Sequence, residues 1–184
     1  EEQDKTKIDI LTNTLATTEG EFNQWMLTLK FQNRKMYDAL TINPTSLGDI
    51  QQDIPEGTLI IEYFVSTDQL YIFCIGKKYF YAKGVSIPEK DLKEDVINYL
   101  SYCKSPQPMK ARKLEKQGIK LYKILLTPVE TELNKFENIV IVPYGILYYL
   151  PFHSLIRKKA NKKEYFIERK RISYTTSATF SDVL

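Results

Sequence analysis

The hydrophobic pattern is sharpest between residues 138 and 155, in the segment NIVIVPYGILYYLPFHSL. It opens with four consecutive β-branched residues, Ile139 to Val142, which Pro143-Tyr144-Gly145 interrupts. A short, uniformly apolar run bounded by such breakers predicts a strand buried on both faces, as in a parallel sheet under helices. Because Pro143 lacks a backbone donor and Gly145 tolerates positive φ, we expect the strand to end there in a sharp turn.

The first 45 residues have a helical period instead. Apolar side chains recur at alternating spacings of three and four and so share one stripe of a helix predicted over residues 4–40. Gly20 weakens a helix interior by roughly 1 kcal/mol, which leaves open one long helix or two; we favour one, because the stripe keeps its phase. The stripe is a packing surface that could dock a protein partner. It consists of Ile8, Leu11, Leu15, Phe22, Trp25, Leu29, Met36 and Ala39, with Thr18 and Gln32 interrupting it.

Between residues 46 and 86 the period changes from helical to extended. Ser46 to Asp49 has the spacing of a capping box and predicts a short helix through Asp53, and Pro55-Glu56-Gly57 predicts a turn. The segments TLIIEYFV, QLYIFCI and KYFYAKGVSI then predict three strands of an antiparallel meander. Glu62, inside the first of them, is expected to face solvent or pair with a base.

Three further helical segments precede the apolar strand. Ser86 to Glu89 again has capping-box spacing, with Pro88 near the first helical position. After a loop at residues 105–108, a longer helix carries apolar residues on one side and a solvated basic face on the other. Thr127-Pro128-Val129-Glu130 predicts a third helix with Thr127 as N-cap. The residues expected to be buried by the three are Leu92, Val96, Tyr99, Leu100 and Cys103; Ala111, Leu114, Leu121 and Leu125; and Val129, Leu133 and Phe136.

Composition and charge divide the chain in two. A chain of 184 residues with 43% hydrophobic residues and a mean hydropathy of −0.33 indicates a folded domain and excludes a disordered one. Residues 1–56 hold 5 Lys/Arg and 10 Asp/Glu, whereas residues 57–184 hold 21 and 13. The change of sign near residue 56 indicates two units with different surroundings.

The sequence also limits the cellular compartment in which we expect the protein. No apolar run approaches the roughly 20 residues of a membrane span, and the charged start, EEQDKTK, does not resemble a signal peptide. Two cysteines without paired spacing favour reduced thiols. We therefore expect a cytoplasmic protein that does not bind membranes.

Candidate catalytic chemistry is limited to two cysteines and one histidine. Cys74 lies in an apolar strand and Cys103 ends a helical pattern, so both are interpreted as small hydrophobic residues. His153, the single histidine, follows Pro151-Phe152 and is interpreted as a packing and hydrogen-bonding residue. No Cys/His metal spacing and no glycine-rich phosphate loop is present. The sequence therefore predicts no catalytic residue, no metal and no cofactor.

The segment from Arg157 to Arg171 is strongly basic, with 8 Lys/Arg against 2 Asp/Glu. Such a run is typical of a contact for nucleic acid or an acidic partner. Because no aromatic residues suited to base stacking are interleaved with it, we interpret it as a solvated hairpin tip and do not expect nucleic-acid binding. A loop over Lys158–Lys163 is predicted, followed by a strand from Tyr165 to about Thr175.

Three patches together resemble the CHAT domain family, caspase-like domains often found behind tetratricopeptide repeats. Ile54–Ile75 looks like the family's opening hairpin, and Leu121–Ile156 is similar to its helix–Pro–helix–strand segment. Arg171–Thr179 looks like a later strand end, with Ser177 in the family's serine position. Tyr144 replaces a more usual acidic residue. The matching positions in the second patch are Val142, Pro143, Gly145, Leu147, Leu150, Pro151, Phe152 and Leu155.

The resemblance covers residues 46 to 184, which we expect to be the N-terminal part of a CHAT domain, and residues 1–45 then look like a helical linker or the end of an upstream repeat array. The implied fold is α/β, with an N-terminal helix or helical hairpin, then an antiparallel meander and helices packed on a mixed sheet, as in the pseudo-caspase-like half of a CHAT domain. The chemistry it implies is that of clan CD cysteine peptidases, in which a thiolate attacks the peptide carbonyl and a histidine moves protons.

Neither the family's His-Gly motif nor its strand-ending cysteine occurs in residues 1–184. The resemblance therefore implies a non-catalytic front portion. That portion would scaffold the catalytic half of the same protein and couple it to upstream sensor helices. The alternative is a stand-alone protein–protein interaction module that docks a partner through the Ile8–Ala39 stripe.

Overall fold

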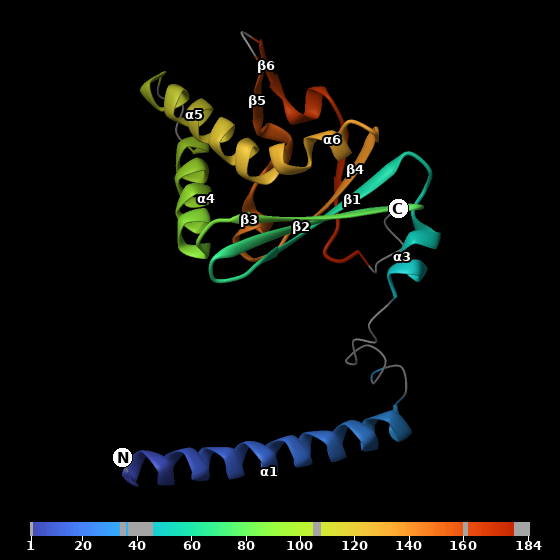
Figure 1. Cartoon of the computed structure of the whole chain (residues 1–184), viewed down its shortest axis with the longest axis vertical. Helices are drawn as coiled ribbons and strands as arrows, with labels where there is room; N and C mark the ends of the chain where they lie inside the picture. The colour runs from blue at the N-terminus through green and yellow to red at the C-terminus, as the bar shows by residue number, and fades with distance from the viewer. Residues whose placement is uncertain (1, 34–35, 37–45, 105–107, 160–161, 179–184) are drawn as a thin grey trace. The chain divides into compact units, whose positions relative to one another are not determined.

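The computed structural model describes residues 2–33, 36, 46–104, 108–159 and 162–178 (Figure 1). The chain divides into two compact units, Glu1–Thr45 and Ser46–Leu184. The larger unit is a mixed α/β structure, which confirms the predicted fold class.

The first unit contains the long helix α1 (Glu2–Gln32), which passes through Gly20 without a break. This confirms one continuous helix through Gly20; the choice between a single helix and a helical hairpin stays open, because residues 37–45 lie outside the described part of the chain. The helix ends at Gln32, so the predicted extension to residue 40 is wrong at Asn33, and residues 37–40 lie outside the described part. Asn33 marks the break, because its side-chain oxygen accepts a hydrogen bond from the Met36 backbone N–H at 3.1 Å. This is the spacing of an N-cap, and Met36 is itself helical.

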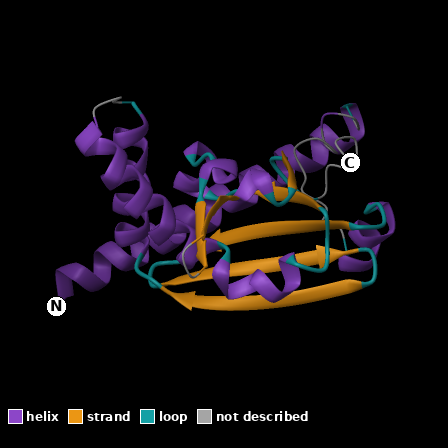
Figure 2. Cartoon of the chain, turned by 90° about the horizontal axis from the view of Figure 1, so that it is seen from above, coloured by secondary structure: helices purple, strands orange, loops and turns teal. Residues whose placement is uncertain are grey.

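A five-stranded mixed sheet forms the centre of the second unit (Figure 2). Its strands are β1 (Thr58–Val65), β2 (Gln69–Gly76), β3 (Tyr79–Ser86), β4 (Asn138–Val142) and β7 (Arg171–Tyr174), in the order β3-β2-β1-β4-β7. The pairs β1–β2 and β2–β3 are antiparallel, which confirms the predicted meander. β4 lies parallel to both β1 and β7, and Ile139 to Val142 are buried, as the apolar run predicted.

The predicted helix cap at Ser46 and the predicted turns at Gly57 and Gly145 are confirmed. Ser46 caps α3 (Leu47–Asp53), because its hydroxyl accepts a 3.2 Å hydrogen bond from the Asp49 backbone N–H. Gly57 has a φ of +77° in the turn before β1, and Gly145 has a φ of +55° directly after β4. Both values lie in the left-handed region that glycine adopts without steric cost.

The helices α4 (Glu89–Cys103), α5 (Pro108–Leu125) and α6 (Glu130–Leu133) cover one face of the sheet. Alternate residues of β1 point to that face, and Tyr63 among them donates a 3.1 Å hydrogen bond to the Leu125 carbonyl. The opposite face carries a smaller cluster formed by Ile54, Ile60, Ile75, Val140, Val142 and Ala178. The helix-covered core includes Leu59, Ile61, Val65, Leu92, Val96, Leu121, Leu125, Val129, Leu133 and Ile139.

Two predicted N-caps are wrong. Ser86 remains in β3, and Pro88, which has no side-chain donor or acceptor, takes the N-cap position of α4. Thr127 lies inside a 3₁₀ turn, η1 (Thr127–Val129), and its hydroxyl donates to the Tyr122 carbonyl at 3.5 Å. The N-cap position of η1 belongs to Leu126, which directly follows α5.

Two burial predictions are also wrong. Cys103 is exposed, because Tyr99 is the last fully buried residue of α4 and the helix continues past the packed core. Ala111, in the first half of α5, is exposed as well. By contrast, Leu121 and Leu125 of the same helix are fully buried, as predicted.

The basic segment folds differently from its prediction. Lys158 and Lys159 belong to β5 (Ile156–Lys159), which pairs with β6 (Lys162–Tyr165) as a two-stranded hairpin, so the predicted loop is wrong. The strand predicted from Tyr165 begins only at Arg171, because a 3₁₀ turn, η4 (Phe166–Glu168), intervenes. Phe166 stabilises that turn, since its side chain is fully buried and its N–H donates to the Leu155 carbonyl at 2.9 Å.

Candidate functional site

The two cysteines occupy different environments. Cys74 is buried on β2, as predicted, and burial, reinforced by Glu132, raises its pKa to about 12. A thiol with that pKa stays protonated near neutral pH and is a poor nucleophile. Cys103 is exposed at the end of α4, and partial desolvation raises its pKa above the ordinary value. Neither thiol has the lowered pKa of an activated nucleophile.

His153 lies in a 3₁₀ turn, η3 (Phe152–Ser154), and is exposed. Its ring Nδ1 is 3.2 Å from the hydroxyl of Tyr174, and its backbone N–H donates to the same hydroxyl at 3.3 Å. The Tyr174 ring in turn packs 6.4 Å from the Phe152 ring. This geometry gives His153 a phenol as its partner. The prediction that it has no catalytic role stays a prediction.

A group of aromatic side chains gathers where the parallel strands end. The carboxyl ends of β1, β4 and β7 meet at one edge of the sheet, and open α/β sheets bind ligands at such edges. Phe64 from the end of β1 lies 5.1 Å, ring to ring, from Tyr144, which follows β4. We call Phe64, Tyr144, Tyr148 and Tyr174 the carboxyl-edge cluster; all four are at least 40% exposed.

A shallow hollow of about 210 Å³ opens within this cluster. Its walls include Tyr148 and Tyr174, with Pro143 between the two strand ends. The Tyr148 hydroxyl donates to the Thr176 carbonyl at 3.3 Å, which fixes the ring at the rim. The sequence analysis missed this cluster, although the tyrosines directly after the apolar strand were a usable signal.

A second group of polar side chains is built around Glu130 at the start of α6. One of its carboxylate oxygens accepts a 2.8 Å hydrogen bond from the Tyr122 hydroxyl. The other lies 2.9 Å from Arg169 Nη2 and 3.3 Å from Arg157 Nε. Arg169 Nη1 also donates to the Tyr122 hydroxyl at 2.6 Å. We call these four residues the Glu130 network.

The Glu130 network joins three distant parts of the chain. Burial and the hydrogen bond to Glu130 raise the pKa of Tyr122 well above its ordinary range, so the phenol remains a donor. Glu164 adds a second carboxylate, 3.8 Å from Arg157 and 3.9 Å from Arg169. Arg157 and Arg169 of the basic segment therefore form ion pairs within the domain. For these two residues the interpretation of the segment as a solvated hairpin tip is wrong.

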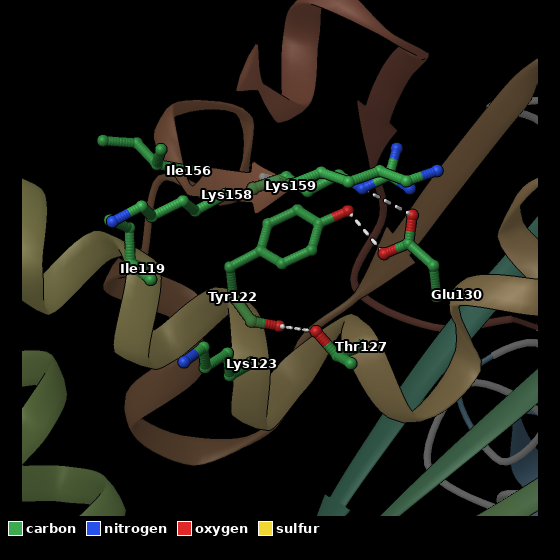
Figure 3. Close-up of a pocket in the computed structure, with 9 residues that line it drawn as sticks. Ile119, Tyr122, Lys123, Thr127, Glu130, Ile156, Lys158 and Lys159 are labelled. Atoms are coloured by element: carbon green, nitrogen blue, oxygen red, sulfur yellow. Dashed lines mark hydrogen bonds and ion pairs between the residues drawn. The ribbon is translucent and has the colours of Figure 1, made fainter. Parts of the chain in front are cut away.

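A hollow of about 460 Å³ lies beside the Glu130 network, between α5, η1 and β5 (Figure 3). Its lining includes four cationic side chains, those of Lys123, Arg157, Lys158 and Lys159, and one carboxylate, that of Glu130. Figure 3 shows the Tyr122 hydroxyl directed toward Glu130 and the Lys158 side chain running toward Ile119. We call this hollow the lysine pocket.

Glu62 lies on the face of β1 away from the helices, opposite Phe73 of β2. Its side chain is partly buried, and burial raises the pKa of its carboxyl above the ordinary value. Among the described residues no Lys or Arg forms an ion pair with it. The predicted pairing with a base is therefore wrong within the described part of the chain.

The described residues form neither a metal site nor a membrane-spanning helix. No group of three or more His, Cys, Asp or Glu side chains there could hold a metal ion. The helices that the structure describes are too short or too polar to cross a membrane.

The C-terminal part of the chain is similar to a known protein family. The family model described as CHAT domain matches residues 115–184, which include the second half of α5, α6, β4 and β7. No curated protein matches the chain. The matched segment contains His153, Tyr174 and the whole Glu130 network.

Proposed function

We propose, on the match of residues 115–184 to the family model described as CHAT domain, that the chain is a non-catalytic, pseudo-caspase-like portion of a CHAT-domain cysteine peptidase. Its role is to scaffold the catalytic half of the same protein and to couple that half to upstream sensor helices. Its free thiols fit a cytoplasmic location, which is part of the proposal.

The single observation that carries the proposal is the open edge of β7. Among the described residues β7 pairs with β4 alone, and it stands at the parallel end of the sheet. Parallel strands are usually covered on both faces and flanked by further strands, and an unpaired edge presents free backbone donors and acceptors. A strand from the catalytic half that pairs with β7 would satisfy these groups and continue the sheet.

The carboxyl-edge cluster supports the same interpretation. Tyr174 on the open strand and Tyr148, which hydrogen-bonds to Thr176 just after it, are exposed. Aromatic side chains are enriched at the cores of protein interfaces, where they bury large apolar areas. A catalytic half that extends the sheet at β7 would cover these rings, so the two features favour one interface.

The cysteine environments also support a non-catalytic role. A peptidase nucleophile needs a lowered pKa or an adjacent base, whereas burial raises the pKa of Cys74 and of Cys103. His153 is hydrogen-bonded to Tyr174. The proposal therefore assigns peptide cleavage to the catalytic half.

The direct test is peptidase activity of the 184-residue chain. We expect no turnover of a panel of fluorogenic peptides that end in Lys, Arg or Asp. Turnover that C103A or H153A abolishes would overturn the proposal. Turnover that is equal in the wild type and in both variants comes from a contaminating peptidase, and it leaves the proposal standing.

A second candidate function is a stand-alone interaction module that docks a partner through α1. The observation that favours it is the exposure of Leu11, Leu15, Phe22 and Trp25 along one stripe of that helix. The open reading frame that encodes the chain discriminates the two functions. A His-Gly dipeptide followed by a strand-ending cysteine downstream supports the peptidase portion, and a natural stop near Leu184 supports the module.

A further inference from the structure

We propose that the lysine pocket binds a compact polyphosphate anion. The inference is independent of the proposed function, since it rests on the charges and shape of the pocket alone. Its volume of about 460 Å³ lies in the range of small-molecule sites, about 300–1,000 Å³. The binding groups come from two elements, Lys123 from α5 and Lys158 and Lys159 from β5.

The charge of the pocket is not balanced from within. Glu130 is the one carboxylate in its lining, and Arg157 and Arg169 both lie within ion-pair distance of that carboxylate. Lys123, Lys158 and Lys159 form no ion pair with any residue that the structure describes. The lining therefore carries uncompensated positive charge, which favours an anion in the hollow.

The neighbouring lysines of the same hairpin behave differently. Lys162 lies 2.8 Å from Glu164, and Lys163 lies 2.6 Å from Glu115. The hairpin therefore pairs the lysines of β6 with carboxylates and leaves those of β5 for the pocket. This contrast within one hairpin distinguishes the pocket from a uniformly solvated basic surface.

The residue types favour phosphate over carboxylate. A lysine ammonium is a compact point charge with rotatable donors, which suits the several oxygens of a phosphate group. Planar, bidentate recognition of carboxylates is the strength of arginine, and the one arginine of the lining, Arg157, is already held by Glu130. This site would use side-chain amines, so the lack of a glycine-rich loop does not bear on it.

The pocket also has an apolar part. Ile119 and Ile156 belong to its lining, and the Tyr122 ring lies between them and Glu130 (Figure 3). A ligand that joins a polyphosphate to a flat ring could place the ring there. Inorganic tripolyphosphate and ATP are therefore the two probes, and the ratio of their affinities identifies whether the source is inorganic or a nucleotide.

The test is isothermal titration calorimetry with the full 184-residue chain in about 0.05 M NaCl, where surface charges are weakly screened. We expect K158A/K159A to weaken tripolyphosphate binding at least about tenfold. The matched control is K77A/K78A, which removes two adjacent, exposed lysines from the β2–β3 turn and should change the affinity less than about twofold. K123A supplies an independent variant on α5, with an expected loss of about threefold.

Three results would overturn the proposal. The first is no heat of binding for either probe. The second is an equal loss in K158A/K159A and K77A/K78A, which would show attraction to net charge alone. The third is tighter binding of a glutamate-rich peptide than of both phosphate probes, since that would assign the pocket to an acidic protein segment.

Discussion

The guanidinium of Arg169 lies 2.9 Å from the carboxylate of Glu130, although one residue follows η4 and the other begins α6. The same guanidinium donates to Tyr122 on α5 at 2.6 Å. The pair therefore ties the segment before β7 to the helical layer. Because both side chains are largely buried, 13% and 19% exposed, the contact is less screened by solvent than a surface ion pair.

Removing Arg169 should destabilise the domain measurably. Breaking a fully buried pair costs about 3–5 kcal/mol because it leaves an uncompensated charge. Arg157 still faces Glu130, and the site is partly solvated, so we expect R169M to lower the free energy of unfolding by about 2 kcal/mol. Urea denaturation measures it.

The matched control for this variant is R171A, since Arg171 is exposed at the start of β7. It should change the free energy of unfolding by less than about 0.5 kcal/mol. E130Q and E130Q/R169M complete a double-mutant cycle that measures the coupling between Glu130 and Arg169, and Arg157 keeps Glu164 as a partner at 3.8 Å in both. Equal stabilities of R169M and the wild type would contradict the assigned pair.

The two thiols should differ in reactivity toward a disulfide reagent. Cys103 is exposed and should react in the native protein, at a rate that rises with pH because only the thiolate reacts. Cys74, whose pKa burial raises to about 12, should react only when the protein unfolds. C103A should therefore abolish the native-state reaction. Two reactive thiols in the native wild type would show that β2 is not packed as described.

The contribution of Glu62 to the free energy of unfolding should be larger in mild acid than near neutral pH. Because burial raises the pKa of Glu62 in the folded state above its ordinary value, the folded protein binds that proton more tightly than the unfolded chain. The contribution is fully present below the ordinary pKa and is lost as pH rises through the folded pKa.

The substitution E62Q removes this dependence. We expect its urea midpoint to exceed that of the wild type at pH 7, and the gap to close in acid below the ordinary carboxyl pKa. E56Q, which alters an exposed glutamate in the turn before β1, is the matched control and isolates the effect of burial. A gap that widens toward acid would reverse the assigned sign and refute the explanation.

Trp25 reports directly on the α1 stripe, because it is the single tryptophan of the chain. The indole is 51% exposed and lies 6.3 Å, ring to ring, from Phe22. We expect fluorescence emission typical of a solvated indole and efficient quenching by acrylamide. Addition of a partner that covers the stripe should shift the emission to shorter wavelength. A strongly blue, unquenched emission from the chain alone would mean that the stripe is already covered.

The sequence by itself determined the elements whose signals are local. The change from helical to extended period at Thr58 located the meander, and the uniform burial of Ile139 to Val142 followed from an apolar run between breakers. Ser46 and Gly145 acted through their own backbone and side-chain geometry. Each of these outcomes depends on residues a few positions apart, so the sequence pattern contains the needed information.

Only the tertiary structure decided which distant segments meet. The parallel pairing of β4 with β1 and β7 produces the carboxyl edge, and thereby brings Phe64 and Tyr144 together. Phe166 is buried in a 3₁₀ turn where the sequence predicted a strand. Arg157 and Arg169, which belong to a basic run in the sequence, form ion pairs with Glu130 in the fold. Charge and period along the chain could not show this, because the energy of an ion pair or a buried ring depends on neighbours that the fold supplies.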